Sequence, residues 1–137
     1  METDDLASIT TVQITALTTA QVAALTTGQV SNLTTAQVAN LATLQVTALT
    51  TAQVVSLSTD QVKALKTAQL AVMTTAQVAK METDDVAAIT TAQITGLTTA
   101  QIAALSTAQV VALGTNQVSK LGTAQLAALT TAQVAKM

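Results

Sequence analysis

The chain has 137 residues, half of them apolar, and it contains no Phe, Tyr, Trp, His, Cys, Pro or Arg. This composition removes most nucleophiles, metal ligands and general bases, so we expect no enzyme, no catalytic residue, no metal and no cofactor. The net charge of −2, built from few acids and few lysines, gives no basic surface for nucleic acid, and no 18-residue stretch is free of Thr and Gln. We therefore expect neither a nucleic-acid partner nor a membrane span.

An eight-residue repeat runs through the chain. Residues 1–137 divide into 17 octads that start at Met1, with Met137 left over, and the consensus is Leu-Thr-Thr-Ala-Gln-Val-Ala-Ala. Position three is Thr in every octad, position five is Gln in all but two, and positions one and six are always aliphatic or Met. We expect these four positions to carry the fold of a single repeat array, and the variable positions two, four, seven and eight to face solvent.

A longer period lies over the octads. The sequence Met-Glu-Thr-Asp-Asp at residues 1–5 recurs at residues 81–85. This recurrence predicts two sub-units, residues 1–80 and 81–136, with Met137 starting a further unit.

Two alternatives to short helices follow from the repeat length. In one continuous helix each octad would rotate the apolar pair by roughly 80° around the axis, so no stable apolar stripe would form. A β-solenoid is the stronger alternative, because Thr and Val favour strands. Its corners require residues that tolerate positive φ, however, and the four glycines occupy no fixed position.

The pattern favours an all-α solenoid, or superhelix, with one short helix in each octad. The invariant Thr is the expected N-cap, because its hydroxyl can accept a hydrogen bond from a free N–H of the first turn, and the helix would run from position four to about position eight. Apart from Glu2, Glu82 and Lys66, the acids lie near the expected helix starts and the lysines near the ends. The expected caps are Thr11, Thr19, Thr27, Thr35, Thr43, Thr51, Thr59, Thr67, Thr75, Thr91, Thr99, Thr107, Thr115, Thr123 and Thr131.

The Gln at position five shares a helix face with the aliphatic residues, so we expect its amide to be buried. A buried amide needs hydrogen-bond partners, and backbone groups between neighbouring octads are the expected ones. The expected buried amides are Gln13, Gln21, Gln29, Gln37, Gln45, Gln53, Gln61, Gln69, Gln77, Gln93, Gln101, Gln109, Gln117, Gln125 and Gln133.

Two acidic clusters are the only weak candidates for a metal site. They contain three acids each, and hard cations such as Ca²⁺ bind carboxylate oxygens. We favour helix-start charge over metal binding, because neither cluster has the glycine turn or the fourth ligand of a calcium loop. The candidates are Glu2, Asp4, Asp5, Glu82, Asp84 and Asp85.

The octad at residues 97–104, Leu-Thr-Thr-Ala-Gln-Ile-Ala-Ala, resembles octapeptide arrays of large bacterial surface or exported proteins that are described as adhesin-like. This resemblance covers the whole chain and implies an extracellular or cell-surface spacer. The same octad is similar to the opening of a transcription activator-like effector repeat, Leu-Thr-Pro-x-Gln-Val. Here Thr replaces the Pro, and the rest of that repeat, with its base-reading pair, is missing, so the similarity implies a helix start and no DNA recognition.

We therefore expect a structural array that acts as a spacer or presentation scaffold in a larger exported protein. The alternative is an interaction module that binds peptide, glycan or itself, which predicts that unusual residues at the variable positions cluster on one face. Open solenoid ends should also favour end-to-end self-association. The residues that test the alternative are Val12, Leu44, Asp60, Lys63 and Lys66.

Overall fold

A computed structural model describes residues 2–137, so Met1, the expected first residue of the array, lies outside it. The described residues form seventeen helices of four to six residues and no strand, as the prediction of one helix per octad requires. The β-solenoid alternative is wrong for this part of the chain. The helices are α1 (Thr3–Ser8), α2 (Thr11–Thr15), α3 (Thr19–Ala23), α4 (Thr27–Ser31), α5 (Thr35–Asn40), α6 (Thr43–Ala48), α7 (Thr51–Val55), α8 (Thr59–Ala64), α9 (Thr67–Ala71), α10 (Thr75–Lys80), α11 (Thr83–Ala88), α12 (Thr91–Ile94), α13 (Thr99–Ala104), α14 (Thr107–Ala112), α15 (Thr115–Val118), α16 (Thr123–Ala128) and α17 (Thr131–Val134).

Every helix starts at the invariant Thr, so the N-cap is the residue before it, at position two. The prediction that the fifteen invariant threonines from Thr11 to Thr131 are N-caps was therefore wrong by one residue. In α13 the cap is Thr98, whose extended backbone has φ −73° and ψ 160°, and its Oγ1 accepts a hydrogen bond from the Gln101 N–H at 3.2 Å. Eleven Thr or Ser residues at position two cap their helices in this way.

The invariant Thr itself contributes little to the core. Its side chain is exposed in most of the octads from Thr19 onward, whereas positions one, five and six supply the core. One contact of this position with the next turn is seen at Thr67. A Cβ added at Gly96 would come within 2.8 Å of the Thr67 Cγ2, so the threonine methyl lies directly against that glycine.

The connection between helices is made by two extended residues at positions one and two. Leu41 and Ala42, for example, have ψ angles of 135° and 153°. No described residue has a positive φ, so the chain changes direction without needing glycine at the bend. This explains why the glycines occupy no fixed position in the octad.

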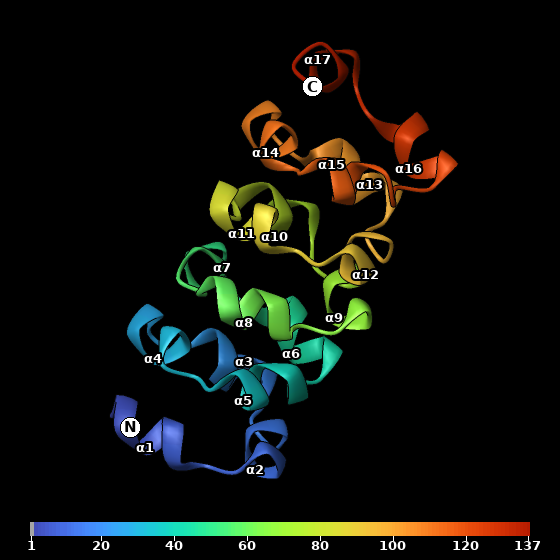
Figure 1. Cartoon of the computed structure of the whole chain (residues 1–137). Helices are drawn as coiled ribbons and strands as arrows, with labels where there is room; N and C mark the ends of the chain where they lie inside the picture. Colours follow the sequence, from blue (N-terminus) through green and yellow to red (C-terminus); the bar gives the residue numbers. More distant parts are fainter. Residues whose placement is uncertain (1) are drawn as a thin grey trace.

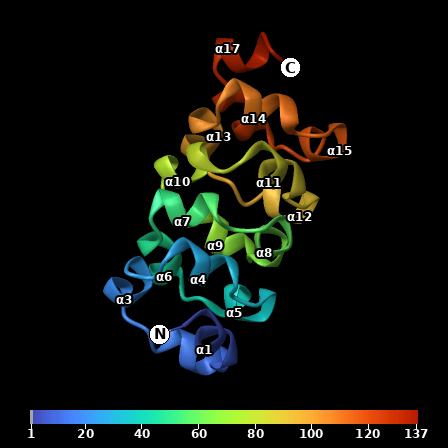
Figure 2. The same cartoon turned by 90° about the vertical axis from the view of Figure 1, so that its left-hand side faces the viewer.

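The helices are stacked into an elongated superhelix with the chain termini at opposite ends (Figure 1). Figure 2 shows the same order from the side, with α1 at one end and α17 at the other. Each helix from α1 to α14 packs against the third helix after it, so one turn of the superhelix takes more than two octads and neighbouring turns lie against each other.

One continuous core runs along the superhelix. The side chains at position six are at most 2 % exposed from Leu6 to Val110, and those at position one are at most 8 % exposed from Leu33 to Leu113. A helix of four to six residues is unstable alone, so this shared core is what holds each one in place. No described helix has the length and hydropathy required to cross a bilayer.

Substitution at the two adjacent threonines distinguishes the N-cap from the first helical residue. Thr98→Ala removes the acceptor of the Gln101 N–H and should lower the free energy of unfolding by about 1 kcal/mol. Thr99→Ala, at the invariant but exposed position, should cost clearly less. Urea unfolding followed by circular dichroism measures both values, and a larger loss at Thr99 would contradict the assignment of the cap.

Candidate functional site

The amide of the Gln at position five caps the N-terminal end of its own helix. In all fifteen cases its Oε1 accepts a hydrogen bond from the backbone N–H of the residue at position two, as in Gln101, which accepts from Thr98 at 2.8 Å. Together with the Thr hydroxyl this is a capping box, whose Thr-x-x-Gln spacing is already visible in the sequence and would have placed the cap at position two. The Gln half needs only a backbone N–H, and it persists at Ala42, where the distance is 2.8 Å.

The Nε2 of the same amide joins one turn of the superhelix to the turn before it. Gln101 Nε2 donates to the carbonyl oxygens of Leu70 and Met73, both at 2.7 Å, which lie 31 and 28 residues earlier. These carbonyls are at the C-terminal end of a helix, where backbone acceptors lack partners within the helix. Met73 begins the octad of α10, against which α13 packs, and Leu70 belongs to the octad before it, so the amide bonds the connection that leads into the helix beside its own.

Twelve glutamines make this pair of bonds, and each is buried, with its donor groups satisfied by backbone acceptors. We call this set the glutamine ladder. Its members are Gln37, Gln45, Gln53, Gln61, Gln69, Gln77, Gln93, Gln101, Gln109, Gln117, Gln125 and Gln133.

The first three glutamines are less buried than those of the ladder. Gln13 and Gln21 are exposed and Gln29 is half-buried, so the prediction that these three amides are buried was wrong. Gln13 and Gln21 lie within the first turn, and their Nε2 groups donate to no carbonyl among the described residues. The Oε1 bonds to their own helix starts are nevertheless present, at 2.8 Å in each case.

Asp85 interrupts the ladder. It replaces the Gln of the eleventh octad and is only 3 % exposed, and none of the described residues forms a hydrogen bond with its carboxyl. The register of the ladder would place residue 85 against the carbonyls of Val54 and Leu57, which a carboxylate cannot approach favourably. Burial, and then the negative charges of Glu82 and Asp84, raise the pKa of Asp85 to about 6.

The acidic clusters do not form a metal site in the described chain. Among the described residues, no three acidic side chains lie close enough together to hold a metal ion. In the second cluster Asp85 is buried, whereas Glu82 and Asp84 are exposed at the helix start. Asp4 and Asp5 are exposed in the first turn of α1, which matches the interpretation as helix-start charge.

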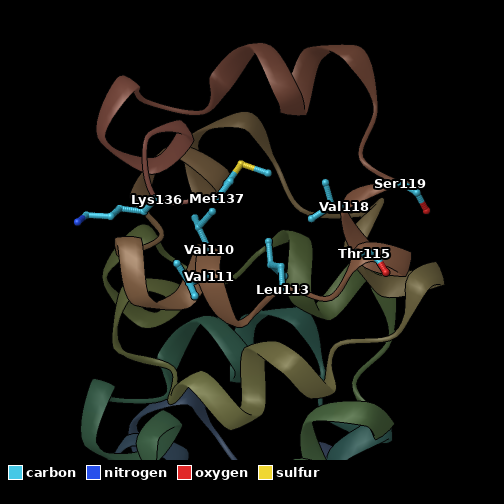
Figure 3. Close-up of a pocket in the computed structure, with 8 residues that line it drawn as sticks. All are labelled: Val110, Val111, Leu113, Thr115, Val118, Ser119, Lys136 and Met137. Atoms are coloured by element: carbon cyan, nitrogen blue, oxygen red, sulfur yellow. The ribbon is translucent and has the colours of Figure 1, made fainter.

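Two cavities lie at opposite ends of the superhelix. The larger, of about 400 Å³, is at the C-terminal end and is mainly apolar; Figure 3 shows Met137 above Val110 and Leu113, with the Lys136 amine directed away from them. It is lined by Val110, Val111, Leu113, Thr115, Val118, Ser119, Lys136 and Met137. The second, of about 260 Å³, is in the first turn and is lined by Leu17, Gln21, Ala24, Leu25 and Gln29. Neither cavity brings an aspartate together with a nucleophile.

The unusual residues at variable positions lie on several different helices. Val12 in α2 and Leu44 in α6 are 76 % and 72 % exposed, although both are apolar. Asp60 and Lys63 are exposed in the first and last turns of α8, and Lys66 is the N-cap residue of α9. Whether these residues form one binding face stays a prediction.

Removal of one ladder amide should be far more costly than removal of an amide at the open end. Gln101→Leu leaves the Met73 carbonyl and the Thr98 N–H without partners and removes one of the two hydrogen bonds to the Leu70 carbonyl, and we expect a loss of about 2–4 kcal/mol in the free energy of unfolding. The matched control Gln21→Leu loses only the Oε1 bond at an exposed site and should cost about 0.5–1 kcal/mol. Equal losses in urea unfolding would show that the inter-turn bonds add nothing.

Asp85 should make stability depend on pH. Its pKa is 3.8 in the unfolded chain and about 6 in the folded chain, so the folded chain binds more protons between these values and stability falls as pH rises through this window. Asp85→Gln removes the buried carboxyl, so it should abolish this fall and stabilise the chain at pH 7. We expect a gain of about 1–2 kcal/mol, less than the full pKa shift corresponds to, because solvent screens the charges of the exposed Glu82 and Asp84. Asp5→Gln is the control, because it leaves Asp85 in place and should retain the fall; thermal unfolding between pH 3.5 and 7.5 measures both.

Comparison with protein families places the chain among proteins with the same repeat. The model of the ALTTAQ repeat matches residues 1–35, 55–81, 78–115 and 110–137, which together make up most of the chain. Comparison with curated proteins and with solved structures gave no match. In the motif Ala-Leu-Thr-Thr-Ala-Gln, the first Ala is position eight of one octad. The following Leu and Thr are the two extended residues of the next octad, the second Thr begins its helix, and the Gln is its position five. The chain thus belongs to the ALTTAQ repeat family, as a tandem array of octapeptide repeats.

Proposed function

We propose that this structural repeat array acts as a spacer or presentation scaffold in a larger exported protein. The observation that carries the proposal is the uniformity of the glutamine ladder, in which twelve amides make the same pair of bonds to the preceding turn. Such a structure keeps its geometry when whole octads are added, so its length can vary without a change in fold.

The exported and cell-surface setting rests on the resemblance to bacterial adhesin-like arrays. The absence of a catalytic role rests on composition, because the sequence contains no His, Cys or Arg and the two cavities bring no acid and nucleophile together. The low charge likewise supports a role that does not involve nucleic acid.

A second candidate is an interaction module that binds peptide, glycan or another copy through its surface. It is favoured by Val12 and Leu44, which are more than two-thirds exposed at a position where most octads carry Ala. Large exposed apolar side chains are typical of contact surfaces when they gather in one patch.

Pulling a single molecule by its two ends tests the spacer. Because each octad is held only by its neighbours and by the adjoining turns, the array should lengthen in small, similar steps from its ends. One abrupt all-or-none rupture would count against a spacer. Gln101→Leu is an internal control, since it should lower the force of the steps that involve its own two turns and leave the other steps unchanged.

A further inference from the structure

Three polar groups have no hydrogen-bond partner in the described chain where the eleventh octad meets the turn before it. None of residues 2–137 donates to the Leu57 carbonyl, accepts from the Glu82 N–H or forms a hydrogen bond with the Asp85 carboxyl. Leu57 and Asp85 are 6 % and 3 % exposed, so both residues are largely withdrawn from water. Unsatisfied polar groups weaken the contact that buries them.

Elsewhere in the ladder the Gln amide satisfies the same groups. Its Oε1 accepts from the N–H at position two, and its Nε2 donates to the carbonyl at position one, three octads earlier. An aspartate can make the first of these bonds, since Asp5 Oδ2 accepts from the Glu2 N–H at 3.2 Å. Asp85 makes neither, so the loss is specific to the contact that it enters.

The apolar part of this contact is intact. α11 packs against α8, and Val62 and Val86 at position six are fully buried. The two helices are therefore held by apolar packing without the directional bonds that set the register of the other turns. Contacts with fewer satisfied bonds open more readily than their neighbours. We call the contact between α8 and α11 at Leu57, Glu82 and Asp85 the joint.

A proton on Asp85 changes which bonds the joint can form. An ionised carboxylate is an acceptor only, and the register of the ladder sets it against carbonyl oxygens. A protonated carboxyl has one O–H, which can donate to the Leu57 carbonyl as Nε2 does in the ladder. Burial, and then the charges of Glu82 and Asp84, raise the pKa of Asp85 to about 6, which brings this change close to neutral pH.

The charged groups around the joint do not neutralise the carboxylate. Glu82 and Asp84 lie in its own octad and are acidic. The charged residues of α8 are Asp60 and Lys63, both exposed, and α14, which packs on the other side of α11, has none. None of these groups is paired with Asp85. Ionisation therefore leaves a buried charge without compensation at the joint.

We propose that the joint is an acid-closed hinge, in which α8 and α11 stay together while Asp85 carries a proton and separate when its carboxyl is ionised. The hinge divides the array near residue 81, where the recurrence of Met-Glu-Thr-Asp-Asp begins. It gives a place to the pH dependence predicted above, because a fall in global stability does not say where the array opens. The hinge would operate whether or not the array serves as a spacer.

Thiol labelling measures this opening, because the chain contains no cysteine. Val86→Cys places a thiol at the joint, and Val46→Cys places one at the same octad position in a contact bonded by Gln45. Each labelling rate with 4,4′-dithiodipyridine is divided by the rate of the unfolded chain at the same pH. The ratio of the Val86→Cys rate to the Val46→Cys rate should rise about tenfold from pH 5 to pH 7.5, as a pKa of about 6 in the closed joint and 3.8 in the open one requires.

Two substitutions of the acid are the matched controls. Asp85→Asn has the size of the protonated acid and cannot ionise, and Asp85→Gln restores the residue of the ladder. In either background the same ratio should be independent of pH, and circular dichroism should match the parent. The two variants change the side chain in different ways, so one of them remains informative if the other does not fold.

Transfer of the aspartate to another octad tests the cause. Gln45→Asp removes the two bonds to the earlier turn, so Val46→Cys in this background should be labelled faster than before at pH 7.5. The midpoint of its pH dependence should lie below that of Asp85, because Ala42 and Leu44 stand at the positions that carry acids in the eleventh octad.

Several results would overturn the hinge. These are a labelling ratio that is the same at pH 5 and pH 7.5, a pH-dependent ratio that persists in a folded Asp85→Asn or Asp85→Gln chain, or a folded Gln45→Asp chain whose Val46→Cys thiol is labelled no faster. An equal rise at Val86→Cys and Val46→Cys would show that the whole array loosens, which would keep the predicted fall in stability and exclude an opening at the joint.

Discussion

The structure depends on one interaction that recurs along the chain, the hydrogen bonds of the Gln amide at position five. The Gln at position five accepts a hydrogen bond from the start of its own helix and donates two to the end of a helix one turn earlier. Helices this short have no stability of their own, and an apolar core alone does not define how far one turn is shifted along the next. Hydrogen bonds are directional, so the amide provides the register that the aliphatic side chains cannot.

The same amide explains which substitutions the octads accept. Position two tolerates Ala, Gly and Lys because its backbone N–H is bonded by the Gln whatever side chain it carries. Position five tolerates only Asp as a replacement in this chain, once at the exposed Asp5 and once at the buried Asp85. Burial of a charged carboxyl is unfavourable, and at Asp85 it raises the pKa to about 6.

Much of this could be predicted from variation among the octads, because an unbroken period of eight with two aliphatic positions and one amide restricts the possible folds. The predicted position of the N-cap was wrong because Thr occurs at both positions two and three. Position three is the invariant one, but the cap is the residue at position two. The exposure of Gln13 and Gln21 could not be read from their own octads, which carry aliphatic residues at positions one and six like the octads of the buried glutamines. Burial there depends on a neighbour about thirty residues away, and a local pattern carries no information about whether that neighbour exists.

Each helix from α1 to α14 packs against the third helix after it, so helices three octads apart lie side by side along the superhelix. An outward-facing residue thus has its nearest counterpart in an octad three repeats away, and the octads directly before and after it face other directions. A partner that contacts one side of the molecule would therefore meet every third octad, and substitutions in the octads between would leave that contact unchanged.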